Sequence, residues 1–242
     1  MFISSGYLET YYGTDGEIAR FFVNREPPAH NLYWQGKLLY LRPSPGYLFI
    51  PLIIDLLYKS GIEKKQLLSE KFVTLMEQLG HISALEETKQ ITGKQAISES
   101  ARLVKDNCFN REWHTNLVNH LTGKESNFFA ALSAPFKALH RGDLFLFSVC
   151  ALQFAPALSE KIAEQWFALI TTLLLLDDAE DLKADTQTGD ENAFLESGMT
   201  AEGLTKIKQL VNSNLKKMST VNSLMATQLK KQFDEVVNIL PF

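Results

Sequence analysis

Residues 166–185 read WFALITTLLLLDDAEDLKAD, an apolar helix pattern that turns acidic halfway along. The first half, up to Leu176, is apolar on all sides, which is typical of a helix surrounded by other helices. The second half carries Asp177, Asp178, Asp181 and Asp185. We therefore expect a protein built around a buried helix whose last turns are strongly acidic.

The acidic residues are expected to continue the inward-facing side of this helix. Counting back from Asp177 at helical spacing gives Leu173, Ile170 and Trp166, and counting forward gives Asp181. Carboxylates that face a core are costly unless a positive charge meets them, and a divalent metal ion is one such charge. The alternative is that the helix leaves the core here and its acids form a solvated face.

Beyond residue 45 the chain has the pattern of an all-α protein. Apolar residues recur at spacings of three and four, with Gly or Asn between the segments. The expected helices cover 46–60, 63–91 (one helix, or two with a bend at Gly80), 94–107, 110–122, 125–140, 143–155, 159–185 and 200–238. We predict a helical bundle of about 8–10 helices over 46–242.

Residues 1–45, rich in Tyr, Gly and Pro, are expected to form an irregular N-terminal segment. Thr14-Asp15-Gly16-Glu17 fits a capping box and predicts a short helix at 15–24. Asn31 to Arg42 is predicted to form a small hairpin that turns at Gln35-Gly36. No repeat, low-complexity tract or linker divides the chain, so we expect a single domain over 1–242.

Composition limits the class of protein. The formal net charge of the 242 residues is −4, with acids and bases interspersed, which argues against a general nucleic-acid binder. The longest uncharged stretch, 144–158, is shorter than a bilayer-spanning helix, so no stable membrane insertion is expected. The presence of only Cys108 and Cys150, without a signal-peptide pattern, predicts a cytoplasmic protein.

Mg²⁺ binding is the chemistry that suits the acidic run best. Asp177 and Asp181 are one helical turn apart, as are Asp181 and Asp185, and Asp178 lies near the same edge. Mg²⁺ prefers carboxylate oxygens and leaves coordination sites open to substrate phosphates. By contrast, His114 and His120 lack the spacing of the His-Glu-x-x-His zinc motif, and we expect them to pack or cap.

The run Asp177-Asp178-Ala179-Glu180-Asp181, followed by Asp185, Gly189 and Asn192, resembles the second aspartate-rich motif of class I isoprenoid synthases. The resemblance is specific over residues 166–196. It implies an isoprenoid synthase-like helical bundle, Mg²⁺ as the cofactor and a prenyl diphosphate as the small-molecule partner, and hence a transferase or a lyase. Asp177, Asp178 and Asp181 would be the metal ligands, with Asp185 in support.

The first aspartate-rich motif of that family has no clear equivalent upstream. The nearest candidate is the segment 79–87, which offers Glu86 and Glu87 as metal ligands in place of aspartates. The resemblance also implies basic residues that bind the diphosphate, and the candidates are Arg42, Lys137 and Arg141. The structural alternatives are a loop arginine at 42 and interaction with a helix dipole at 137–141.

Two functions remain open from the sequence. One is an isoprenoid synthase-like protein that uses Mg²⁺ to bind or ionise a prenyl diphosphate. The alternative is a non-catalytic helical member that lacks the first acidic motif and binds a ligand or a protein. The segment 200–238 offers a candidate homodimer face. Five phenylalanines are expected in the core, or alternatively around a prenyl chain: Phe128, Phe129, Phe136, Phe145 and Phe147.

Overall fold

The computed structural model describes residues 3–26, 28–34, 45–124 and 127–240, and this part of the chain is all-α, with no strand. The α-helices are α1 (Ser5–Tyr12), α2 (Gly16–Asn24), α3 (Pro45–Lys59), α4 (Lys64–Leu67), α5 (Glu70–Glu87), α6 (Gly93–Val104), α7 (Arg111–Leu121), α8 (Asn127–Ala130), α9 (Ser159–Thr188), α10 (Ala193–Glu196), α11 (Ala201–Ser219) and α12 (Ser223–Val237). The 3₁₀ helices are η1 (Leu32–Trp34), η2 (Lys105–Asn107), η3 (Lys137–His140), η4 (Asp143–Ala151) and η5 (Pro156–Leu158). The all-α fold class is confirmed, and α4, α8 and α10 are single turns that the sequence pattern did not resolve.

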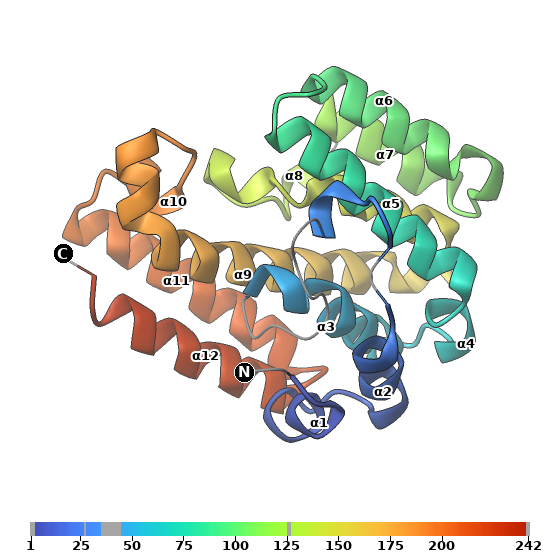
Figure 1. Ribbon diagram of the computed structural model, residues 1–242, viewed down its shortest axis with the longest axis horizontal. Coiled ribbons are helices and arrows are strands. Elements are labelled where there is room, and N and C mark those ends of the chain that lie inside the picture. The colour runs from blue at the N-terminus through green and yellow to red at the C-terminus, as the bar shows by residue number, and fades with distance from the viewer. Residues whose placement is uncertain (1–2, 27, 35–44, 125–126, 241–242) are drawn as a thin grey trace.

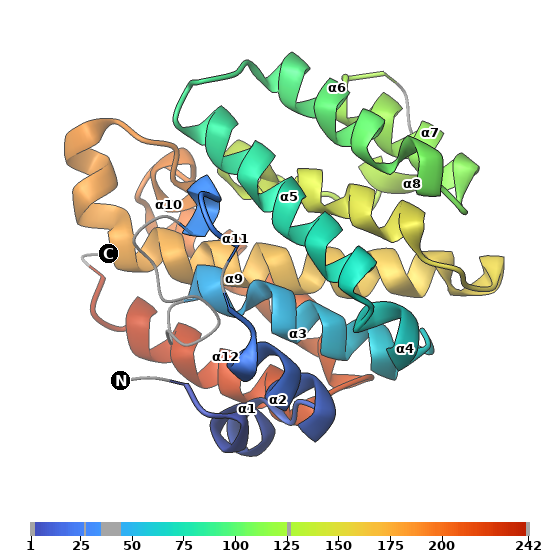
Figure 2. The ribbon, with the colours of Figure 1, turned by 45° about the vertical axis from the view of Figure 1, so that its right-hand side comes forward.

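Helix α9 runs through the middle of the molecule, with α11 and α12 on one side and α5, α6 and α7 on the other (Figure 1, Figure 2). Every residue from Ile162 to Ala179 is buried except Glu164, Leu174 and Asp177, which are partly exposed. Helices α3 and α11 pack directly against α9. The apolar run of the sequence is therefore the centre of the hydrophobic core.

The first 45 residues contain more helix than expected. Besides α2, whose first turn is capped by Asp15, there is α1, which begins after Ser4 and ends at Gly13 in a left-handed conformation with φ 60°. A buried carboxylate of α3 joins the start of α2 to the start of α12. Asp55 accepts hydrogen bonds from the backbone N–H of Asp15 and from the Asn222 amide, each at 2.8 Å. Of the hairpin predicted at 31–42, residues 35–42 lie outside the described residues, and residues 32–34 form the 3₁₀ helix η1 and not a strand.

Four predicted helices differ in the structure. The segment 63–91 divides into α4 and α5 at Leu68-Ser69, and Gly80 lies inside α5 without dividing it. The segment 125–140 holds only α8 and η3 in its described part, because Pro135 between them lacks an N–H donor and disfavours helix in the residue before it. The segment 143–155 forms the 3₁₀ helix η4, which is buried between α5, α6 and α7. The segment 200–238 is two helices, because Asn222 accepts from the Met225 N–H and starts α12.

Among the described residues, no helix has both the length and the apolar character needed to cross a lipid bilayer. Both cysteines, Cys108 and Cys150, are free thiols.

Candidate functional site

The acidic end of α9, defined as Asp177, Asp178, Asp181 and Asp185, meets the segment 137–143 and the loop that leads to α10 (Figure 1). Helix α9 continues to Thr188 and is closed by Gly189 at φ 75°, whose N–H donates to the Asp185 carbonyl. The positive φ is one that glycine adopts at little cost. All four carboxylates therefore stand on one rigid helix.

The cation that meets this cluster is Arg141. Its Nη2 lies 2.6 Å from Asp178 Oδ1 and 3.7 Å from Asp177 Oδ2, and its Nη1 donates to the Glu191 carbonyl at 2.9 Å. Burial acts to lower the pKa of Arg141, but the charges of Asp178 and Asp177 raise it. The predicted residues Arg141, Asp177 and Asp178 are thus in direct contact.

Asp178 is bound on both of its oxygens. While Oδ1 pairs with Arg141, Oδ2 accepts from the Ala193 N–H at 2.7 Å. The Asn192 amide donates to the Asp178 carbonyl at 2.7 Å and to Asp185 Oδ2 at 2.8 Å, and its own oxygen accepts from the Phe194 N–H. Asp178 and Asp185 therefore fasten the start of α10 to α9, a role that spacing along the helix did not reveal.

The inward-facing acid is Asp178 and not Asp177, which corrects the expected orientation. The side chain of Asp178 is 1% exposed and that of Asp177 is 37% exposed, and Asp181 is an exposed residue. Along one side of α9, exposure rises from the buried Leu173 through the partly exposed Asp177 to the exposed Asp181, so this side of the helix leads out of the core. Asp177 and Asp181, together with the partly exposed Asp185, are consequently the aspartates of this cluster that solvent reaches.

The acidic end of α9 carries uncompensated negative charge. Burial raises the pKa of Asp177 to about 6; Arg141 acts against this rise, and the charges of Asp181, Asp178 and Glu180 add to it. Burial also raises the pKa of Asp178, although Arg141 and the Ala193 N–H counteract it. A single arginine therefore does not balance the carboxylates around it.

Glu86 and Glu87, at the C-terminal end of α5, lie within electrostatic reach of this region. The charge of Glu87 contributes to the raised pKa of Arg141. The pKa of Glu86 is raised by desolvation and then by Glu191, the residue whose carbonyl accepts from Arg141. Both glutamates are exposed. The structure brings the two candidate acidic segments to the same part of the molecule, without an ion pair between Arg141 and either glutamate.

The remaining predicted cations differ in their positions. Lys137 is 77% exposed and its ammonium group pairs with Glu191, while its backbone N–H donates to Glu196 Oε2 at 2.7 Å. Lys137 is thus beside the acidic end of α9 but points its charge at Glu191. Arg42 lies outside the described residues. The phenylalanines Phe129, Phe145 and Phe147 are buried and packed against other aromatic rings, as expected for core residues.

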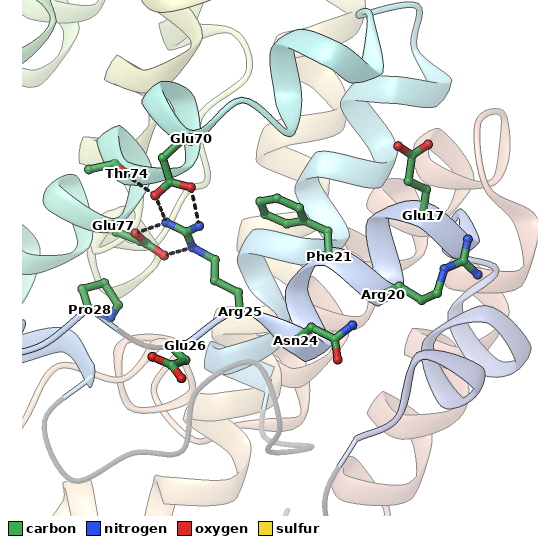
Figure 3. A pocket seen from close by; sticks show the side chains of 10 residues that line it. All are labelled: Glu17, Arg20, Phe21, Asn24, Arg25, Glu26, Pro28, Glu70, Thr74 and Glu77. Carbon is green, nitrogen blue, oxygen red and sulfur yellow. Dashed lines mark hydrogen bonds and ion pairs between the residues drawn. The ribbon is translucent and has the colours of Figure 1, made fainter.

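Two hollows of the described surface lie elsewhere. One, of about 760 Å³, separates α2 from α5, and in it Arg25 reaches between Glu70 and Glu77 (Figure 3). The guanidinium contacts Glu77 Oε1 at 2.5 Å and Glu70 Oε2 at 2.9 Å, so its charge is already used to join the two helices. The other, of about 670 Å³, lies beside the first half of α5 and the end of η4. Neither is lined by a residue of α9.

Comparison with protein-family models, with curated proteins and with solved structures finds no match. The resemblance to class I isoprenoid synthases accordingly remains a prediction from the residues of α9 and the loop after it.

Proposed function

We propose that this protein is an isoprenoid synthase-like protein that uses Mg²⁺, held by Asp177 and Asp181, to bind a prenyl diphosphate. The observation that carries the proposal is that these two carboxylates stand one turn apart at the open end of a central helix, next to an arginine too heavily paired to neutralise them. Carboxylate oxygens are the donors that Mg²⁺ prefers, so the residues fit the ion.

The residues at the acidic end of α9 would have two roles, to bind the metal ion and to position the helix against the loop before α10. Asp177 and Asp181 would hold the ion, whose chemistry is to offset the charge of a departing diphosphate. Asp178 and Asp185 hold the loop before α10 against α9 by accepting hydrogen bonds from Asn192 and Ala193. Arg141 and Lys137 would bind the diphosphate by exchanging their present partners, Asp178 and Glu191, for its oxygens, and Glu86 and Glu87 are further candidate metal ligands.

A second candidate function is a non-catalytic helical protein that keeps the acidic helix and binds a ligand or a protein partner. Two observations favour it. Arg141 is already engaged with Asp178, and three of the five phenylalanines expected near a prenyl chain, Phe129, Phe145 and Phe147, are buried in the core. In this candidate the acidic end of α9 serves binding without ionising a substrate.

Thermal melting with Mg²⁺ and inorganic pyrophosphate, alone and together, tests the proposal. A site that is filled to about 100 times its Kd stabilises a protein by about 2.7 kcal/mol. For a chain of this size that corresponds to about 5–10 °C in Tm. We expect such a shift only when both are present, and its loss in Asp177→Asn and Asp181→Asn. Asp106→Asn, an exposed aspartate in η2, is the matched control and should keep the shift.

Release of pyrophosphate from C10, C15 and C20 allylic diphosphates separates the two candidates. Release that requires Mg²⁺ and Asp177 supports the enzyme. A joint Mg²⁺ and pyrophosphate shift without release from any of these substrates supports the non-catalytic candidate. Absence of any shift at millimolar Mg²⁺ and pyrophosphate would reject the metal–diphosphate site altogether.

A further inference from the structure

A second group of metal-ligating side chains lies on the other side of the segment 137–143. His120 comes from the last turn of α7, His140 from the end of η3, and Asp143 from the start of η4. One ligand atom from each residue lies within 4.8 Å of the others. His140 and Asp143 are three residues apart, but His120 lies on a different helix and the set forms none of the known zinc motifs, which is why spacing alone did not find it.

The distances within the His120–His140–Asp143 cluster suit a small ion. His140 Nδ1 lies 2.8 Å and His120 Nε2 lies 3.8 Å from the same oxygen, Asp143 Oδ2. Ligand atoms at 2.0–2.1 Å from a tetrahedral Zn²⁺ are about 3.3 Å apart, so the observed separations bracket that value. A tetrahedral ion would require His140 Nδ1 to move away from Asp143 Oδ2, and His120 Nε2 to move toward it, by about 0.5 Å each.

An independent observation comes from the second oxygen of Asp143. The residue is 2% exposed, and its Oδ1 is buried without a hydrogen-bond partner among the described residues. A buried carboxylate oxygen without a partner costs about 1–3 kcal/mol or more. This cost would disappear if a metal ion were coordinated by both oxygens of Asp143, or if a water molecule bound to the ion donated a hydrogen bond to Oδ1. Asp143 thus has the burial and the unused oxygen of a metal ligand.

The surroundings of His140 also match those of a metal ligand. The Asp143 carboxylate is the strongest hydrogen-bond partner of the His140 ring, and the backbone carbonyl of Ala134 is close enough to interact with the ring as well. Metal-ligating histidines ordinarily have such a second partner for the ring nitrogen that does not bind the metal. The side chain of His140 is 35% exposed, which gives an ion a path from solvent.

We propose that His120, His140 and Asp143 form a binding site for Zn²⁺ or a similar divalent transition metal. Two imidazoles and one carboxylate are typical protein ligands of zinc, and three protein ligands leave a fourth position for water. The site joins α7 to the η3–η4 segment. It is separate from the carboxylates of α9, which offer only hard oxygen donors.

Calorimetric titration of Zn²⁺ into chelator-treated protein at pH 7.5 tests this site. We expect one equivalent to bind with a Kd in the micromolar range or below. His120→Gln and His140→Gln should each weaken binding at least tenfold. His114→Gln, on the same helix but outside the cluster, is the matched control and should bind normally. Circular dichroism checks that each variant is folded, and the two histidine variants avoid removing the buried Asp143.

Co²⁺ provides a second readout, because a tetrahedral site gives strong visible absorption bands that a hexa-aqua ion does not. These bands should appear in the wild-type protein and in His114→Gln, and disappear in His120→Gln and His140→Gln. Lack of stoichiometric Zn²⁺ binding would overturn the proposal. So would binding that persists unchanged in both cluster variants, since the ion would then be held elsewhere.

Discussion

Replacing Asp177 by Asn is expected to stabilise the metal-free protein at neutral pH. Its pKa is about 6 in the folded protein, against the ordinary 3.8. A difference of about two pH units corresponds to about 3 kcal/mol between the ionised and protonated forms. Because 37% of the side chain is exposed, solvent screening reduces this value, and we expect a gain of about 1–2 kcal/mol.

The pH dependence has a definite sign. A carboxyl group whose pKa is raised on folding binds its proton more tightly in the native state, so its contribution to stability is greatest below pH 3.8 and is lost as the pH rises through about 6. Asn cannot ionise and escapes this loss. The advantage of Asp177→Asn should therefore be largest at about pH 7.5 and shrink toward about pH 4.

Urea unfolding followed by circular dichroism between these two pH values measures the effect. Asp106→Asn, which changes an exposed aspartate far from α9 in sequence, should alter the free energy of unfolding by no more than about 0.5 kcal/mol. If Asp177→Asn is less stable than the wild-type protein at pH 7.5, or if its advantage does not vary with pH, the acidic end of α9 is not short of positive charge and the reasoning fails.

Two further substitutions test the contacts that position the site. Arg141→Met should cost about 3–5 kcal/mol in urea unfolding because it leaves Asp178 buried without its cation, and adding Asp178→Asn should recover much of that loss; purely additive effects would contradict the ion pair. Gly142→Ala should cost about 1–3 kcal/mol by overpacking, because a Cβ there would lie 2.5 Å from Ile170 Cγ1. In an Ile170→Ala background the added methyl should cost clearly less, and an unchanged cost would show that the close contact is not the cause.

The elements that could be predicted are those in which a single local signal decides the structure. The apolar run that begins at Trp166 predicted the central helix, and the capping-box pattern at 14–17 predicted α2, although the N-cap is Asp15 and not Thr14. By contrast, residues 143–150 are buried throughout, so their apolar pattern fits any buried helix, and packing selected the 3₁₀ form. The helix predicted at 125–140 followed the apolar periodicity, although Pro135 within it disfavours a continuous helix.

For the candidate site, the sequence identified the acids but not their roles. Spacing placed Asp177 on the inward side, but a helix buried on every side has no single inward stripe, and Asp178 is the buried acid. Its partner Arg141 is 37 residues away in the chain, a separation at which helical spacing says nothing about contact. The cluster of His120, His140 and Asp143 could not be predicted from spacing either, because His120 lies 20 residues before His140 on a different helix.

Gly142 has a consequence for how the two proposed sites communicate. It sits against Ile170 between Arg141, which contacts α9, and Asp143, which contacts His140. One short segment therefore carries residues of both proposed sites. If binding at one site shifts this segment, thermodynamic reciprocity requires that each ligand change the affinity of the other by the same factor.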